Sequence, residues 1–235
     1  MTTSLLSFHQ LRDWLCCPQL YAYKHLHMLP DYQHQAEQER GELLHTLITQ
    51  ESLGQSIQPP PDLVELWQNY LNGMLPFREY PSHSEWSYFF QFKTKGMSWG
   101  IHGRFDLLVY LPDSLLIIDW KTGSHSLTDS WQMEWYAWCC HRLRSALNIS
   151  ADLPIQTQCI YLKDGRTQKV LFQPTELEKH EEEFSKHIAQ LNPKEYAFIP
   201  NPHSWQQGSW CERCTYQEIC PEGIRYCHER ADFAV

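Results

Sequence analysis

The sequence has no apolar run near the length of about 20 residues that a membrane-spanning helix requires. Its first residues, 1–4, carry no positively charged side chain, so the usual start of a secretion signal is missing as well. We also find no internal repeat. These absences predict a soluble, cytoplasmic protein without a membrane partner. With 235 residues, 42% of them hydrophobic, we expect one substantial core and a single domain over residues 1–235.

Positive charge is scarce too, because 19 lysines and arginines stand against 28 aspartates and glutamates, giving a net charge of -9. Such a balance disfavours binding to polyanions, which draw on lysine and arginine. Carboxylates gathered around metal ions would lower the net charge in the same way, and the bound ions would offset it. The acidity therefore leaves a metal-dependent protein open.

Nine cysteines without a secretion signal argue against a disulfide scaffold and favour a metal or cluster site. Cys211, Cys214 and Cys220 offer three thiolates in one short segment near the end of the chain, so a fourth ligand would have to come from elsewhere. Three further cysteines lie in apolar surroundings, where cysteine acts as a small buried hydrophobe: Cys139, Cys140 and Cys159.

Hydrophobic periodicity and turn residues predict the following elements. Helices are expected at about 4–15, 37–53, 62–75, 128–147 and 174–191, and strands at about 86–92, 98–110, 115–121, 155–162 and 168–172. The helix between the third and fourth strands implies that these two strands are parallel neighbours. Asp62 is expected to cap its helix, and residues 54–84 are expected to form an insertion or lid. The predicted fold class is α/β, with a mixed central β-sheet flanked by helices and an irregular tail.

The second and third strands carry the most informative charges. Residues 111–114 contain turn formers, so the strands should pair as an antiparallel hairpin. If Leu111 faces Ser114, Asp106 faces Asp119, and Lys121 shares their face with Arg104 opposite it. Two opposed carboxylates repel each other, and a bound cation is the usual reason that such a pair is tolerated. The other face would be apolar and covered by helices: Phe105, Leu107, Val109, Leu116, Ile118 and Trp120.

Several motifs, in this order, resemble those of RecB-type nucleases of the PD-(D/E)XK superfamily. They are a Gly-x-x-x-His element at 41–45, Gly-Arg-Phe-Asp at 103–106, Asp-Trp-Lys-Thr-Gly at 119–123 and Gln-Met-Glu-Trp-Tyr at 132–136. The resemblance implies a restriction-endonuclease-like core and metal-dependent cleavage of phosphodiester bonds.

The resemblance assigns roles to individual residues. Mg²⁺ or Mn²⁺ would be bound by His45, Asp106, Asp119 and the backbone carbonyl of Trp120, a donor set suited to these ions. Lys121 would orient or deprotonate the attacking water and stabilise charge on the phosphate. Gln132 and Tyr136, four residues apart on one helix face, would position the substrate or the site.

The cysteines extend the resemblance to both ends of the chain. A Cys-Pro-x-x-Tyr element at 17–21 is similar to one that, in iron-sulfur members of the family, joins three C-terminal cysteines around one [4Fe-4S] cluster. The implied ligands are Cys17, Cys211, Cys214 and Cys220, and residues 1–25 with 193–235 would form a helical, cluster-binding subdomain. Zinc is the alternative cofactor, although zinc ribbons usually contain two Cys-x2-Cys pairs. Cys16 and Cys227 are alternative ligands.

Three functions follow from these patterns. The first is a metal-dependent DNA nuclease, most similar to the CRISPR-associated iron-sulfur exonucleases or to related repair nucleases. Such a nuclease would act with a protein partner from CRISPR adaptation or from DNA repair. Its DNA would be single-stranded or have unpaired ends, since tryptophans at 131–138 could stack on bases or else form core. The second is a non-catalytic DNA-binding or assembly module acting through a partner, and the third is an unrelated zinc-stapled protein. The oligomeric state stays open.

Overall fold

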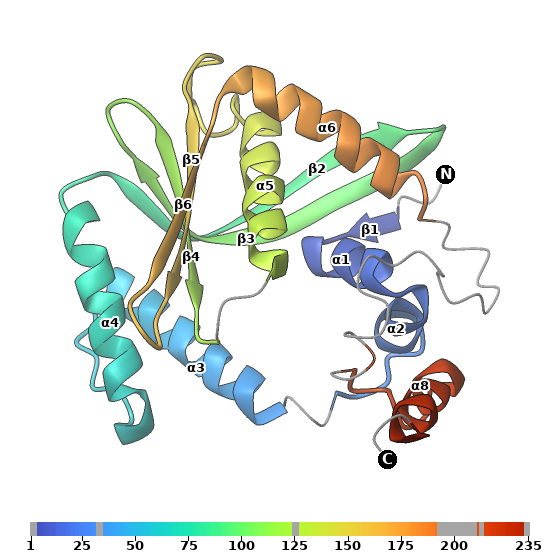
Figure 1. Cartoon of the computed structure of the whole chain (residues 1–235). Helices are drawn as coiled ribbons and strands as arrows, with labels where there is room; N and C mark the ends of the chain where they lie inside the picture. Colours follow the sequence, from blue (N-terminus) through green and yellow to red (C-terminus); the bar gives the residue numbers. More distant parts are fainter. Residues whose placement is uncertain (1–3, 32–34, 124–126, 192–210, 212–213, 233–235) are drawn as a thin grey trace. The chain divides into compact units, whose positions relative to one another are not determined.

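A mixed six-stranded sheet organises the computed structural model, which describes residues 4–31, 35–123, 127–191, 211 and 214–232 (Figure 1). The strand order is β1-β3-β4-β5-β6, and β2 also pairs with β3. The strands are β1 (Ser4–Leu6), β2 (Ser82–Thr94), β3 (Met97–Tyr110), β4 (Leu115–Lys121), β5 (Ile155–Tyr161) and β6 (Thr167–Phe172). The mixed α/β architecture predicted from the sequence is confirmed.

Two hairpins set the register around β3. The first turns at Lys95 and Gly96, whose φ angles of 44° and 78° are those of a two-residue hairpin turn, and it pairs Thr94 with Met97. The second joins β3 to β4 through a hydrogen bond of 3.0 Å from the Leu111 backbone N–H to the Ser114 carbonyl. The pairs from Tyr110–Leu115 to Leu107–Ile118 follow the predicted register.

The crossover after β4 is helical, as predicted. Helix α5 (Leu127–Arg142) connects β4 to β5, and these strands pair in parallel over their whole length, from Leu115–Ile155 to Lys121–Tyr161. Strand β6 then pairs antiparallel with β5 after a turn in which Gly165 has a φ of 70°. The end of β4 therefore lies in the middle of the sheet with a helix crossing one face.

Helices α3 (Gln35–Ser52) and α4 (Val64–Met74) cover one face of the sheet with a continuous hydrophobic core. Segment 54–84 contributes Leu63, Leu66, Trp67, Tyr70 and Phe77 to that core. Part of this segment therefore belongs to the hydrophobic core. Asp62 does not cap α4, because it lies in a short 3-10 helix (Pro61–Leu63), and the residue that precedes α4 makes no side-chain capping bond.

Helices α5 and α6 (Pro174–Ile188) pack on the other face. Trp135 and Trp138 of α5 are fully buried, and both rings contact Phe184 of α6. Phe105 also lies on this face, because its ring contacts Tyr136 of α5 at a centroid distance of 5.3 Å. The prediction that Phe105 shares a face with Leu107 was wrong, since the regular alternation of β3 is interrupted between them, at Asp106.

The chain divides into two compact units, residues 1–5 with 40–185 and residues 6–39 with 186–235. The second unit contains α1 (Phe8–Cys16), α2 (Pro18–Tyr21), a π-helix (Ala22–Leu26) and α8 (Pro221–Asp232). Two predictions are corrected here. Residues 4–6 form a strand, because Ser7 caps α1 with a reciprocal capping box, and part of the tail is helical. Within the described residues, no helix has the length and apolar character to span a membrane.

Candidate metal centre and thiol group

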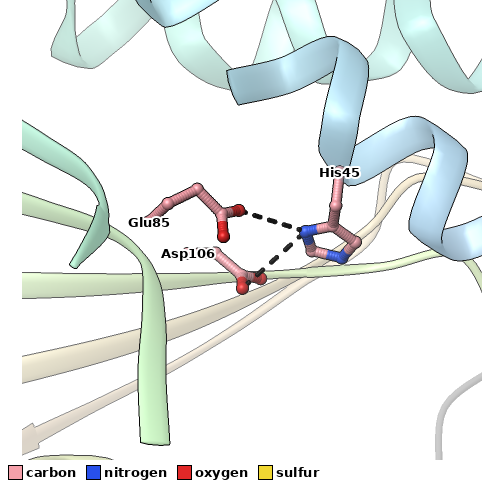
Figure 2. A group of neighbouring side chains, drawn as sticks. All are labelled: His45, Glu85 and Asp106. Carbon is pink, nitrogen blue, oxygen red and sulfur yellow. Dashed lines mark ion pairs between the residues drawn. The ribbon is translucent and has the colours of Figure 1, made fainter. Parts of the chain in front are cut away.

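Three ligand-type side chains, from α3, β2 and β3, lie next to one another (Figure 2). His45 of α3 places Nδ1 3.6 Å from Glu85 Oε1 and 3.8 Å from Asp106 Oδ1. The nearest ligand atoms of the three side chains all lie within 4.8 Å of one another. Imidazole and carboxylate at this spacing form a donor set for a divalent cation.

A local irregularity of the β2–β3 ladder creates this arrangement. Glu85 has a φ of 53°, in the left-handed region that glutamate seldom adopts. The ladder pairs Ser84 with Leu107 and Trp86 with Phe105, but it skips the pair between them, Glu85 and Asp106. Arg104 Nε lies 2.5 Å from Glu85 Oε2 as an ion pair. The sequence predicted that Arg104 lies opposite Lys121. In the structure, Arg104 contacts Glu85 instead.

A second group of polar side chains joins the end of β4 to α5. Lys121 Nζ lies 2.8 Å from Asp119 Oδ2 and donates a hydrogen bond of 2.5 Å to Gln132 Oε1. Gln132 Nε2 in turn donates to Asp119 Oδ1 at 3.1 Å and to the Tyr136 hydroxyl at 2.7 Å. The Cys159 sulfur lies 3.9 Å from Asp119 Oδ2. Both oxygens of Asp119 are thus engaged by neighbours.

Asp106 lies between the two groups. Its Oδ2 accepts a hydrogen bond of 2.9 Å from the Trp120 backbone N–H, while its Oδ1 faces His45. Burial, followed by the charge of Asp119, raises the pKa of Asp106 to about 7. These effects outweigh His45 and the Trp120 N–H, both of which favour the ionised carboxylate.

The two cationic groups of the site respond to the surrounding carboxylates. Burial disfavours charge on Lys121, but Asp119 outweighs that effect and raises the Lys121 pKa. Burial likewise opposes charge on His45, and Glu85 and Asp106 outweigh it, so the His45 pKa is also raised. The site is electrostatically negative and draws positive charge toward it.

The residues of this centre fit a divalent metal ion. His45 Nδ1 and both oxygens of Glu85 are buried and have no hydrogen-bond partner, although buried polar atoms are nearly always paired. They line a cavity of about 350 Å³ together with Glu42, Thr46, Thr49, Arg104 and Asp106. A cation in this cavity would satisfy these atoms and neutralise the carboxylates.

The structure brings the sequence-predicted catalytic residues together in two contact groups. His45 meets Asp106, and Lys121 meets Asp119, Gln132 and Tyr136. Trp120 contributes its backbone N–H to Asp106. Glu85 was missed, although a signal existed. The Lys95–Gly96 turn pairs Thr94 with Met97, and the same register extended along β2 sets Glu85 opposite Asp106.

Two tryptophans of α5, Trp135 and Trp138, are not available for stacking on bases. Trp135 and Trp138 have no exposed surface, so they belong to the core of the first unit. The alternative that assigned them a packing role is confirmed for these two residues.

The four proposed cluster ligands are neighbours in the second unit. The charges of Cys17, Cys211 and Cys220 all act on Cys214, and after burial they contribute to raising its pKa to about 11. None of the four forms a disulfide, and all are partly buried. Cys16, in contrast, is fully buried next to Arg12 and Asp13. Among the described residues, no three of the four sulfur atoms lie within 4.8 Å of one another.

The thiol spacing bears on the choice of cofactor. One tetrahedral zinc ion with bonds of about 2.3 Å would hold its thiolates only about 3.8 Å apart. A [4Fe-4S] cluster binds each thiolate to a different iron and keeps the sulfurs farther apart. The two candidate cofactors thus differ in the thiolate spacing that they require. Cys227 lies in α8 within the described range.

Comparison with known proteins identifies the family. A family model for the PD-(D/E)XK nuclease superfamily matches residues 5–221, and the chain belongs to that superfamily. No curated protein matches. Among solved structures, "Crystal structure of SSO0001" is similar at 12% identity and a TM-score of 0.41, with 95% of this chain and 89% of that chain covered.

Proposed function

We propose that this protein is a Mg²⁺- or Mn²⁺-dependent deoxyribonuclease that hydrolyses phosphodiester bonds. One observation carries the proposal: a chain of the PD-(D/E)XK nuclease superfamily retains an assembled set of His45, Asp106, Asp119 and Lys121 at one end of its sheet. A divalent cation at this centre would supply Lewis-acid stabilisation to the phosphate and acidify bound water. The proposed ligands are His45, Asp106, Asp119 and the Trp120 carbonyl.

The lysine stabilises negative charge on the phosphate. Asp119 raises the pKa of Lys121, so the side chain stays an ammonium group at neutral pH. An ammonium ion next to the scissile phosphate stabilises the charge that develops in the transition state. Of the three roles predicted for Lys121, charge stabilisation and water orientation are favoured over proton abstraction.

Gln132 and Tyr136 position that lysine. The Gln132 amide contacts Lys121 and Asp119 at once and also reaches the Tyr136 hydroxyl. Because Gln132 is 5% exposed and engaged at both ends of its amide, it has one orientation. We assign both residues a positioning role.

The finer assignment rests on the resemblance to CRISPR-associated iron-sulfur exonucleases. We propose an exonuclease with a preference for single-stranded or unpaired DNA ends, acting in CRISPR spacer acquisition or DNA repair together with a partner protein. A cytoplasmic location stays a prediction from the sequence. Stacking by Trp135 and Trp138 is no longer an argument for single strands, because both are buried.

We also propose one [4Fe-4S] cluster at Cys17, Cys211, Cys214 and Cys220. The proposal is supported by the mutual influence of these thiols and by the resemblance of the Cys-Pro-x-x-Tyr element at 17–21. The cluster would have a structural role in the second unit.

The test is degradation of end-labelled single- and double-stranded DNA by anaerobically purified protein with Mg²⁺ or Mn²⁺. We expect cleavage that EDTA abolishes and that Lys121→Ala lowers at least 100-fold, while the exposed Lys163→Ala serves as the charge-matched control. The position of the label gives the polarity. If the wild type with an intact cluster cuts neither substrate, a non-catalytic DNA-binding module becomes the better assignment.

A further inference from the structure

We propose that Glu85 is a cation ligand and that His45, Glu85 and Asp106 form a cation position that prefers Mn²⁺ to Mg²⁺. The inference deepens the proposed nuclease function and rests on it. The RecB-type motifs that mark His45, Asp106, Asp119 and Lys121 include no residue of β2. Glu85 therefore adds a ligand that the family motifs do not supply.

The first support is the state of the ligand atoms. Nδ1 of His45 and both carboxylate oxygens of Glu85 are buried without a hydrogen-bond partner. The Glu85 side chain is only 11% exposed, and its ion pair with Arg104 lacks hydrogen-bond geometry. Buried polar atoms that lack a hydrogen-bond partner are rare, and a bound cation would satisfy them. The side chains of His45 and Glu85 point toward each other (Figure 2), and both residues line the same cavity.

The second support is the separation of this position from Asp119. The two oxygens of Asp119 are held by Gln132 and Lys121, whereas Asp106 directs Oδ1 toward His45. A cation entering the cavity therefore meets Glu85 and His45 without first breaking the Lys121 contacts. Asp106 is the carboxylate that links the position to the rest of the site.

Arg104 competes with a bound cation for the carboxylate of Glu85. Its Nε lies 2.5 Å from Glu85 Oε2 and it lines the same cavity, while its side chain is 56% exposed. A guanidinium that is half in solvent is free to leave when a cation takes over its carboxylate. Removing Arg104 should therefore strengthen cation binding.

The donor types favour Mn²⁺. An imidazole nitrogen with two carboxylates suits Mn²⁺ better than Mg²⁺, which favours oxygen ligands and releases its water reluctantly. The ion expected at this position is thus a divalent transition-metal ion of the size of Mn²⁺.

The experiment measures Mn²⁺ and Mg²⁺ binding to the full-length protein by calorimetry and, for Mn²⁺, by electron paramagnetic resonance. We expect Glu85→Gln to weaken Mn²⁺ binding at least tenfold. Glu42→Gln is the matched control, because Glu42 lines the same cavity and loses the same charge but is not one of the three clustered ligands. It should stay within about twofold of the wild type. Mn²⁺ affinity of Glu85→Gln equal to that of the wild type would overturn the inference, as would wild-type binding that favours Mg²⁺.

Arg104→Gln keeps the test decisive if Glu85→Gln does not fold. It should bind Mn²⁺ more tightly than the wild type, by about threefold or more, and no gain would count against the inference. DNA cleavage is assayed in parallel. If the protein cleaves DNA but neither variant changes Mn²⁺ binding, the cation position at Glu85 is rejected and the nuclease function stands. If Mn²⁺ binding depends on Glu85 but the protein does not cleave DNA, the cation position stands and the nuclease function is rejected.

Discussion

The orientation of the side chains in the candidate centre depends on a few residues that each contact several partners. Gln132 is the clearest case, since its amide oxygen accepts from Lys121 and its amide nitrogen donates to Asp119 and Tyr136. No other side chain in the two contact groups joins the lysine, the carboxylate and the helix in this way within the described residues. Its loss should disturb the orientation of Lys121 without removing a metal ligand.

We expect Gln132→Leu to lower kcat for DNA cleavage about 10- to 100-fold with little change in KM, the size typical of residues that orient the groups of a metal site. Steady-state kinetics on a labelled oligonucleotide would measure it. Gln68→Leu, at an exposed glutamine of α4, is the control. A change confined to KM, or an equal loss in the control, would contradict a positioning role.

Asp13 has a comparable number of partners in the second unit. Its Oδ1 accepts from Arg12 at 2.6 Å, its Oδ2 lies 2.8 Å from His25 Nε2, and Lys24 Nζ is 3.6 Å away. Burial alone would raise the pKa of Asp13, but His25, Arg12 and Lys24 outweigh it and hold the pKa well below its usual range. The ionised carboxylate is therefore stabilised by folding.

We predict that Asp13→Asn lowers the free energy of unfolding by about 3 kcal/mol at pH 7, as expected when a buried ion pair loses one partner. Because the folded pKa is depressed, this stabilisation is complete above the ordinary carboxylate pKa of about 4 and is lost as pH falls below it. Denaturant unfolding at several pH values tests this, with the exposed Asp152→Asn as control. A difference that stays constant below pH 4 would refute it.

Among the elements, β3 and β4 matter most for the centre, and one glycine of β3 is sterically required. A Cβ at Gly103 would lie 2.6 Å from Cζ of Tyr88, whose hydroxyl accepts a hydrogen bond from Trp135 Nε1. At Gly123, beyond the end of β4, a Cβ would meet nothing within 4 Å. The two glycines belong to neighbouring motifs but have different physical reasons for being there.

Gly103→Ala should therefore reduce the free energy of unfolding by about 1–3 kcal/mol through overpacking, while Gly123→Ala should change it by less than about 0.5 kcal/mol. Thermal or urea unfolding of both variants compares them directly. Equal stability of the two variants would show that Tyr88 moves aside at little cost.

Periodicity and turn chemistry predicted most of the elements, including the β3–β4 register and the parallel β4–β5 pair. They failed where the backbone departs from regularity. The φ of 53° at Glu85 and the interrupted alternation near Asp106 depend on contacts between three elements, which no local pattern encodes. The strand at residues 4–6 was mistaken for helix because its apolar spacing also suits a helix, and pairing in the sheet decides such cases.

The whole molecule consists of two compact units with different chemistry. The first unit contains His45, Lys121 and the carboxylates of the candidate metal centre, and the second unit contains the four cysteine thiols. The resemblance to a nuclease family could be found from the sequence because the residues of the candidate centre lie in short motifs that follow one another in a fixed order. The four thiols come from distant segments of the chain, so their proximity to one another could be seen only in the structure.

We expect purified wild-type protein to contain about four irons per chain and Cys214→Ser to lose them, because cluster formation needs all four thiolates. Cys227→Ser, which alters a cysteine outside the proposed ligand set, should keep the iron. Metal analysis and visible absorption measure both, and hydrogen exchange should show faster exchange in the second unit of Cys214→Ser, since metal binding is coupled to folding. Stoichiometric zinc in place of iron would reject the cluster.

The hairpin of β3 and β4, followed by α5, has a consequence for how the protein folds. Asp106, Asp119, Lys121, Gln132 and Tyr136 all lie in one stretch of chain whose contacts are largely local. Local contacts cost little loop-closure entropy and form early. We therefore expect the part of the centre that contains Asp119, Lys121, Gln132 and Tyr136 to form early in folding. His45 lies in α3, in a distant part of the sequence, and is expected to join the centre later.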